Sequence, residues 1–96
     1  MMYKHIDTIS KIEFITPQKA KEYLLINENS RPIDIYKVQR FKRMMERGEW
    51  KLEGVIFLNF TNKLIMTNGQ HRMKALSMSN VEGINFNVSK SIISYK

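Results

Sequence analysis

The sequence predicts a single mixed α/β domain of the α+β kind, spanning residues 1–96. Three observations predict it. With 96 residues, 43% of them hydrophobic, the chain suits one small domain, and no linker divides it. Residues 84–88 alternate between apolar and polar side chains, as a strand with one buried face does. Residues 35–47 instead place apolar side chains at helical spacing.

The N-terminal quarter is expected to hold an arm, a strand and a helix. Residues 1–9 show weak patterning, which predicts a partly ordered, flexible arm. Residues 11–15 alternate and predict the first strand. Thr16 is then a helix N-cap with Pro17 at the first helical position, so we expect a helix from Pro17 to about Asn27.

A second helix is predicted over residues 35–47, after a break at residues 29–32. Pro32 ends the preceding regular structure, and Asp34 is a candidate N-cap. One side of this helix is apolar and should be buried, with Ile35, Val38, Phe41 and Met45.

The opposite side of this helix is basic. Arg40, Arg43 and Arg47 lie within about 60° of one another there, with Tyr36 among them and no acidic residue to interrupt them. A charged stripe is most often only a solvated face. The absence of an acid nevertheless favours these three arginines as a nucleic-acid-binding surface.

The second half of the chain is predicted to be mainly strands. Gly48 suits the end of the second helix, and Trp50 then packs in the core or, as an alternative, stacks on a base. Residues 55–60 and 64–66 predict a hairpin with a short turn between them. A last strand follows at residues 84–88, and the tail from residue 91 either extends it or frays.

Between the hairpin and the last strand lies a strand, a glycine turn and a third helix. Asn68-Gly69 is a tight-turn dipeptide, and the helix should begin near Gln70 and end near residues 79–80. The first N–H groups of a helix lack partners within it, and the helix dipole is positive there. An anion would therefore meet free N–H donors, the missing Cβ of Gly69, a hydrogen bond from His71 and the guanidinium of Arg72.

Two alternatives without ligand binding stay open for this turn. It is an ordinary strand-to-helix connection with exposed His and Arg side chains, or Arg72 ties down a carboxylate or a loop carbonyl. Short glycine motifs often match by chance, so the turn alone does not decide between binding and structure.

The Gly69–Arg72 box, Gly-Gln-His-Arg, resembles that of small phage and plasmid proteins in the ParB/sulfiredoxin-like superfamily. ParB-type partition proteins have Gly-Glu-Arg-Arg there, and sulfiredoxin has Gly-Cys-His-Arg. Thr16-Pro17, Asn29–Ile33 and Gly48–Trp50 agree in order, so the resemblance covers about residues 12–90. It implies a small mixed sheet with three helices. It also implies a phosphate-binding site for CTP or ATP, made by Gly69, Gln70, His71 and Arg72, with Arg31 nearby.

The chain departs from this superfamily in three ways. Gln70 replaces the cysteine that sulfiredoxin needs, which excludes its reduction chemistry. Asn68 stands where related phage proteins often have Asp. The sequence also stops near the point where a partition protein would begin its DNA-binding domain, so we do not expect a complete ParB.

Charge and composition limit the classes of function. A net charge of +7 and a pI near 9.8 favour a polyanionic partner, although a lysine-rich coding bias would give the same balance. There is no cysteine, and His5 and His71 are far apart, so we expect no metal site. The nine acidic residues are scattered, and we expect no catalytic residues. Without a signal peptide or a long apolar run, the expectation is a cytoplasmic protein with no membrane contact.

These observations predict a phage or mobile-element protein that binds nucleic acid or a nucleotide phosphate and is not an enzyme. The alternative is a small inhibitor, an anti-CRISPR or other anti-defence factor, that contacts a host nucleic-acid machine. A ParB-like nuclease or nucleotide hydrolase is the third candidate.

Overall fold

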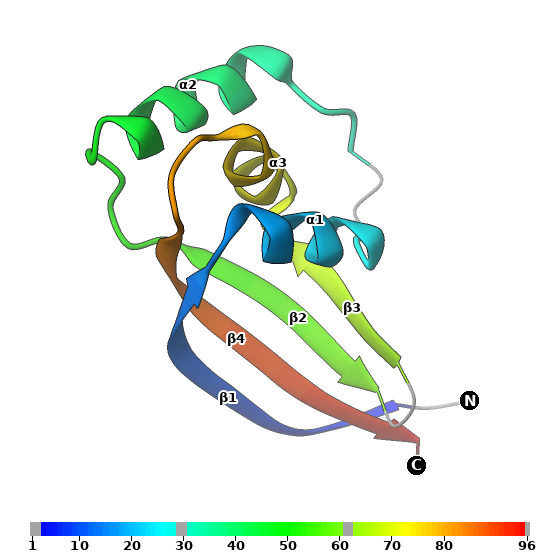
Figure 1. The fold of residues 1–96 in the computed structure, drawn as a ribbon. Helices are drawn as coiled ribbons and strands as arrows, with labels where there is room; N and C mark the ends of the chain where they lie inside the picture. Colours follow the sequence, from blue (N-terminus) through cyan, green and yellow to red (C-terminus); the bar gives the residue numbers. More distant parts are fainter. Residues whose placement is uncertain (1–2, 29–30, 61–62, 96) are drawn as a thin grey trace.

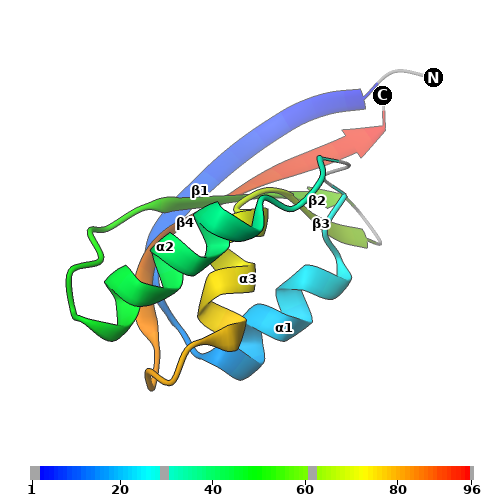
Figure 2. The same ribbon diagram turned by 90° about the horizontal axis from the view of Figure 1, so that it is seen from above.

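The computed structural model describes residues 3–28, 31–60 and 63–95, and it consists of one sheet covered on one face by three helices (Figure 1). The predicted α+β class, with a small mixed sheet and three helices, is confirmed. Seen from above, α3 lies between α1 and α2 (Figure 2). In chain order the elements are β1 (Tyr3–Ile15), α1 (Pro17–Leu25), α2 (Ile35–Glu46), β2 (Gly54–Phe60), β3 (Lys63–Asn68), α3 (Gln70–Met78) and β4 (Ile84–Tyr95).

The strands lie in the order β1-β4-β2-β3, so β1 and β3 form the two edges. β1 pairs with β4 and β2 pairs with β3, both antiparallel, whereas β2 and β4 are parallel. The hairpin of β2 and β3 confirms the predicted hairpin, although residues 61–62 of its expected turn lie outside the described residues. After β2, the chain returns along β3 and then passes through α3 to β4. β4 therefore runs in the same direction as β2, and these two strands form the parallel pair.

The prediction of a flexible arm over residues 1–9 is wrong for residues 3–9, which belong to β1. Residues 1–2 lie outside the described part of the chain. β1 pairs with β4 from Tyr3, opposite Tyr95, to Ile15, opposite Ile84. The register shifts between His5 and Asp7, and such a bulge changes the phase of the alternation, which explains the weak sequence pattern. Of the two alternatives for the C-terminal tail, extension of the last strand is correct.

The core lies between the helices and the sheet face that they cover. β2 and β4 alternate, so Phe57 and Phe86 are fully buried there, while Ile56 and Asn85 point to the other face. The buried hydrophobic residues come from all seven elements: Ile15, Ala20, Tyr23, Val38, Met45, Val55, Phe57, Met66, Met73, Ala75, Leu76, Phe86 and Val88.

The helix starts follow the predicted capping residues closely. The Thr16 side chain accepts a hydrogen bond from the Lys19 amide at the start of α1, and Asp34 does the same at the start of α2. The helix ends differ more, since α1 stops at Leu25, two residues before the expected end. Ile35 was predicted to be buried, but its side chain, in the first turn of α2, is 48% exposed.

Trp50 has the packing role that was the first of its two predicted alternatives. Its ring lies edge-on to Phe41, with ring centroids 5.1 Å apart, and 6.0 Å from the ring of Phe86. These contacts fix the segment between α2 and β2 over the end of the sheet. None of the helices in the described chain has the length and apolar character needed to cross a bilayer.

Candidate functional site

The Gly69–Arg72 stretch lies at the junction of β3 and α3, as predicted. Gly69 precedes the helix with a φ of 120°, a conformation that favours glycine, and no side chain caps the start of α3. A Cβ built there would lie 3.0 Å from Cγ1 of Val55, so the glycine lets the helix start pack against β2. That its missing Cβ also lets an anion approach stays a prediction.

A small pocket of about 80 Å³ opens between α2 and the start of α3. All five residues predicted to bind phosphate line it, together with three that were not predicted to bind it. Lys37 and Phe41 come from α2, and their place in the pocket depends on how α2 packs over α3, which helical periodicity does not specify. The lining residues are Arg31, Lys37, Phe41, Asn68, Gly69, Gln70, His71 and Arg72.

Gln70 links two segments that line this pocket. Its side-chain Nε2 donates a hydrogen bond to the carbonyl oxygen of Arg31, at 3.2 Å, and the residue is only 8% exposed. This bond attaches the segment before α2 to the first turn of α3. The Oε1 atom of Gln70 is buried without a hydrogen-bond partner in the described structure.

His71 contacts the start of α2 through its ring. Nε2 accepts a hydrogen bond from the Asp34 amide at 3.0 Å, so this nitrogen carries no proton and Nδ1 carries it. If His71 donates a hydrogen bond to an anion, as predicted, the donor must be Nδ1. Partial burial lowers the pKa of the imidazole below its usual value of 6.5, and the positive charge of Lys37 lowers it further, while Asp34 opposes both.

Arg72 contacts a backbone carbonyl and a carboxylate, which is the structural role considered as an alternative in the sequence analysis. Its Nη1 donates to the carbonyl oxygen of Gly54 at 2.7 Å, and its Nη2 lies 3.8 Å from Oε2 of Glu53. The guanidinium thus connects the first turn of α3 to the start of β2 while lining the pocket. A phosphate contact by Arg72 stays a prediction.

The charges around the pocket are mostly positive. Arg31, Lys37 and Arg72 line it, and the positive end of the α3 dipole points to it, whereas no Asp or Glu is among its lining residues. Of the two carboxylates nearby, Asp34 caps the α2 amides and Glu53 faces Arg72. An anion in the pocket would therefore meet donors and cations on several sides.

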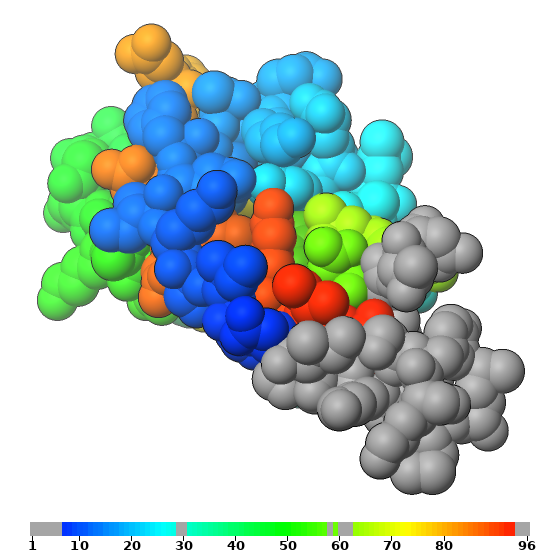
Figure 3. All heavy atoms as spheres, turned by 90° about the horizontal axis from the view of Figure 1, so that it is seen from below, coloured from blue at the N-terminus to red at the C-terminus, as the bar shows by residue number. Residues whose placement is uncertain are grey.

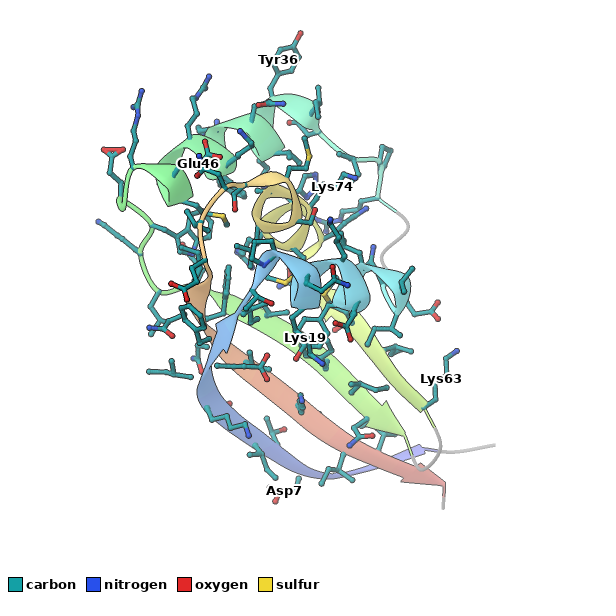
Figure 4. All side chains as sticks on the ribbon, in the orientation of Figure 1. Asp7, Lys19, Tyr36, Glu46, Lys63 and Lys74 are labelled. Carbon is teal, nitrogen blue, oxygen red and sulfur yellow. The ribbon has the colours of Figure 1, made fainter. Side chains whose placement is uncertain are left out.

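The predicted basic face of α2 is exposed, as expected for either of its alternatives. Tyr36 is 83% exposed and points away from the rest of the domain (Figure 4). Arg40 lies over the ring of Phe41, 5.7 Å from the centroid, and Lys37 lies at the same distance from that ring. Phe41 therefore stands between the pocket and the basic face. Arg47 has a loose ion pair with Glu49, at 4.0 Å.

A second, larger hollow of about 510 Å³ lies at the end of the sheet and was not predicted from the sequence. Its walls are mainly apolar, and Phe14 packs there directly on Gly83. The lining residues are Ile12, Phe14, Gly48, Trp50, Leu52, Gly83, Ile84 and Asn85. In the described residues no cluster of three or more His, Asp or Glu side chains could hold a metal ion.

No protein-family model matches this chain, and no curated protein sequence matches it either. The ParB/sulfiredoxin-like resemblance therefore stays a prediction, as does an origin in a phage or mobile element. It depends on four short motifs, one of which, Asn29–Ile33, begins with two residues outside the described part of the chain.

Proposed function

We propose that the pocket between α2 and α3 binds a phosphate group, and that the ligand is a nucleic acid. One observation carries this proposal. The start of α3 has no side-chain cap, and it opens into a pocket that is lined by three cationic side chains and by no acid. Free helix-start N–H groups and the helix dipole bind anions, and Arg and Lys bind phosphate.

The size of the pocket favours a single phosphate group over a whole nucleotide. A volume of about 80 Å³ is well below the roughly 300 Å³ or more of pockets that enclose a whole small-molecule ligand. The sugar and base must then lie outside, on the neighbouring surface.

The neighbouring surface favours a polymer over a mononucleotide. Lys37 in the pocket and Arg40 on the basic face are three residues apart on α2, so their side chains are about 60° apart around the helix. A chain of phosphates can therefore pass from the pocket onto Arg40, Arg43 and Arg47. Tyr36, exposed beside them, offers a ring for base stacking. CTP or ATP would use the pocket alone.

Lys37→Gln tests the pocket. The Lys37 ammonium forms no ion pair in the described structure, and its one ring contact, with Phe41, is at the surface. Its loss should leave the melting temperature unchanged and should weaken binding of a labelled 20-nucleotide single strand about tenfold, the loss expected for one charge-assisted contact. Fluorescence anisotropy measures the affinity, and calorimetric titration with CTP and ATP shows whether a mononucleotide suffices.

Lys21→Gln is the matched control. Lys21 is an exposed lysine on α1 that does not line the pocket, and its replacement removes the same charge. Equal losses in both variants would mean that only net charge matters and would contradict a site at the pocket. If the parent chain binds neither strand nor nucleotide, the phosphate proposal fails, and inhibition through protein contact becomes the leading hypothesis.

A further inference from the structure

β1 is a long edge strand whose outer side is open. It spans Tyr3–Ile15 and pairs only with β4, and no other strand of the described chain lies against its outer side. The three helices lie on one face of the sheet and leave this edge uncovered (Figure 1). In the view from below, the described atoms of β1 lie at the surface beside those of β4 (Figure 3). An open edge of this length presents a row of backbone donors and acceptors to a further strand.

The sequence of β1 is self-complementary about its middle residue, Ile9. Two residues before Ile9 stands Asp7, and two residues after it stands Lys11. One residue to either side stand Thr8 and Ser10, both with hydroxyl groups. In an antiparallel pair of two identical strands centred on Ile9, each Asp7 faces the Lys11 of the other copy. Each Thr8 likewise faces the other Ser10.

We propose that this chain forms a homodimer through antiparallel pairing of β1 with β1 of a second copy, with the two-fold axis at Ile9. The pairing joins two four-stranded sheets into one continuous sheet. A two-fold interface of this kind is isologous, so the Asp7–Lys11 contact forms twice. The backbone hydrogen bonds supply affinity, and the paired side chains set the register.

The charges of β1 select this register over its neighbours. Moving the axis to residue 10 places Asp7 opposite Glu13, and moving it to residue 11 places Lys11 opposite itself. Moving it to residue 8 leaves Asp7 opposite Ile9, without a charged partner. Like charges directly opposite each other destabilise a strand pair. Among these positions only the axis at Ile9 pairs opposite charges.

A register centred on residue 12 would also pair opposite charges, Lys11 with Glu13, but Glu13 is already engaged. Its Oε2 accepts a hydrogen bond from the Tyr23 hydroxyl at 2.6 Å, which holds β1 to α1. By contrast, Asp7 and Lys11 form no ion pair with any described residue, and among the described residues the Asp7 carboxylate accepts a hydrogen bond from the adjacent Thr8 amide. The register at Ile9 therefore uses side chains that the monomer leaves available.

The faces of β1 are consistent with this pairing. Thr8 and Ser10 share one face with Ser91 and Ser89, to which their hydroxyl groups are bonded at 2.9 Å. Asp7, Ile9 and Lys11 therefore lie on the other face, and Ile9 is 54% exposed there. On dimerisation the two Ile9 side chains would meet between the two Asp7–Lys11 pairs. This face is the one that carries the helices, since Lys11 pairs with the buried Val88, and Figure 4 shows Asp7 on a stretch of β1 beyond the helices.

Charged residues on an edge strand commonly prevent pairing, and the register shift after His5 is another such device. In β1, however, the symmetric placement of Asp7 and Lys11 disfavours the shifted registers and favours the register centred on Ile9. The edge therefore accepts a second copy in a single arrangement. If the protein is strictly monomeric, Asp7 and Lys11 instead prevent pairing of this edge.

Charge reversal of the full-length chain tests the proposal by sedimentation equilibrium. The parent should show a monomer–dimer equilibrium between about 10 µM and 1 mM. Asp7→Lys alone and Lys11→Asp alone each place like charges opposite each other twice, and each should weaken the dimer about tenfold or more. The double variant D7K/K11D exchanges the two charges and should restore the dissociation constant of the parent.

Two further variants keep the test decisive. Glu82→Lys and Lys21→Asp reverse charges at exposed positions outside β1 and should leave the dimer unchanged. Ile9→Lys places two lysines at the axis and should give a monomer with a parent-like circular dichroism spectrum, because Ile9 is half exposed in the monomer. A monomeric parent at 1 mM overturns the proposal. So do single variants that dimerise like the parent, or a double variant that stays monomeric.

Discussion

At the scale of single residues, Arg72 shows that one side chain of the pocket has two separate roles. It lines the pocket and also donates a hydrogen bond to the Gly54 carbonyl at 2.7 Å. Lys37, across the pocket, has only the first role in the described structure. The two residues therefore allow binding and stability to be measured separately.

Arg72→Ala should lower both stability and binding. A hydrogen bond from a charged donor contributes about 1.5–3 kcal/mol, and the Arg72 side chain is 26% exposed, so we expect the lower end of this range. For a domain of this size that loss corresponds to a melting temperature lower by about 6–12 °C. Thermal unfolding followed by circular dichroism measures it.

Arg72→Lys separates the contacts further, because lysine keeps the charge but loses the planar fork that reaches both Gly54 and Glu53. We expect it to recover binding more than stability. If Arg72→Ala melts at the temperature of the parent, the Gly54 contact contributes nothing measurable, and the structural role is refuted.

His71 should make the stability of the domain depend on pH near neutrality. Burial and Lys37 lower the pKa of its folded form below 6.5. The unfolded chain then binds more protons than the folded one as the pH falls through about 6.5. Stability is therefore fully present above this pH and falls below it, until the folded imidazole is protonated as well. Urea unfolding at several pH values between about 7.5 and 5.5, where the carboxylates, lysines and arginines keep their charge, measures this loss.

His71→Gln supplies the control for the pH experiment. Glutamine does not titrate, so the part of the pH dependence that comes from His71 should disappear. Identical pH profiles for the variant and the parent would show that the imidazole keeps its ordinary pKa in the folded state.

At the scale of elements, α2 has two faces with different roles. Val38 and Met45 are buried against the rest of the domain, whereas the arginine side is exposed. Asp34 caps the start of this helix and also donates its amide to His71, so the position of α2 is coupled to the first turn of α3. The pocket exists because these two helix starts are held together.

Changing Arg40, Arg43 and Arg47 together to Gln should weaken binding of single-stranded DNA and reduce its salt dependence. Each phosphate contact on a single strand contributes about 0.7 to the slope of log affinity against log salt, so three lost contacts change the slope by about 2. Stability should change by less than about 0.5 kcal/mol, because exposed charges contribute little. Anisotropy titrations from about 50 to 200 mM salt give the slope.

Lys19, Lys21 and Lys63 changed together to Gln form the matched control, since they remove the same charge from α1 and β3. Figure 4 shows Lys19 and Lys63 far from Tyr36. A slope that changes equally in the two triple variants would assign the effect to net charge. An unchanged slope in the arginine variant would mean that the α2 face is only solvated.

At the scale of the whole molecule, all three helices lie on one face of the sheet, and this arrangement separates the pocket from the β1 edge. The helices carry the pocket and the basic face, while the β1 edge lies on the far side of β4 (Figure 1). Pairing of two β1 strands about an axis perpendicular to the sheet would keep both helical layers on the same face of the joined sheet. Two pockets would then face one side, so a single polyanion could contact both.

The sequence by itself determined the parts of this fold that depend on neighbours along the chain. Thr16 and Asp34 were recognisable as caps because each bonds amides two or three residues away. Gly69 was recognisable as the turn before α3 because glycine adopts positive φ at little cost. The α+β class followed from two periodicities that short segments display on their own.

Only the tertiary structure decided what depends on residues far apart in sequence. The pattern of residues 3–9 is weak, yet they form a strand because β4 supplies partners, such as Ser91 for Thr8, 83 residues away. The Gly54 contact of Arg72 and the place of Lys37 in the pocket likewise depend on how elements pack. Local hydrogen bonds are encoded within a few residues, whereas a strand partner or a pocket wall exists only after distant segments have met.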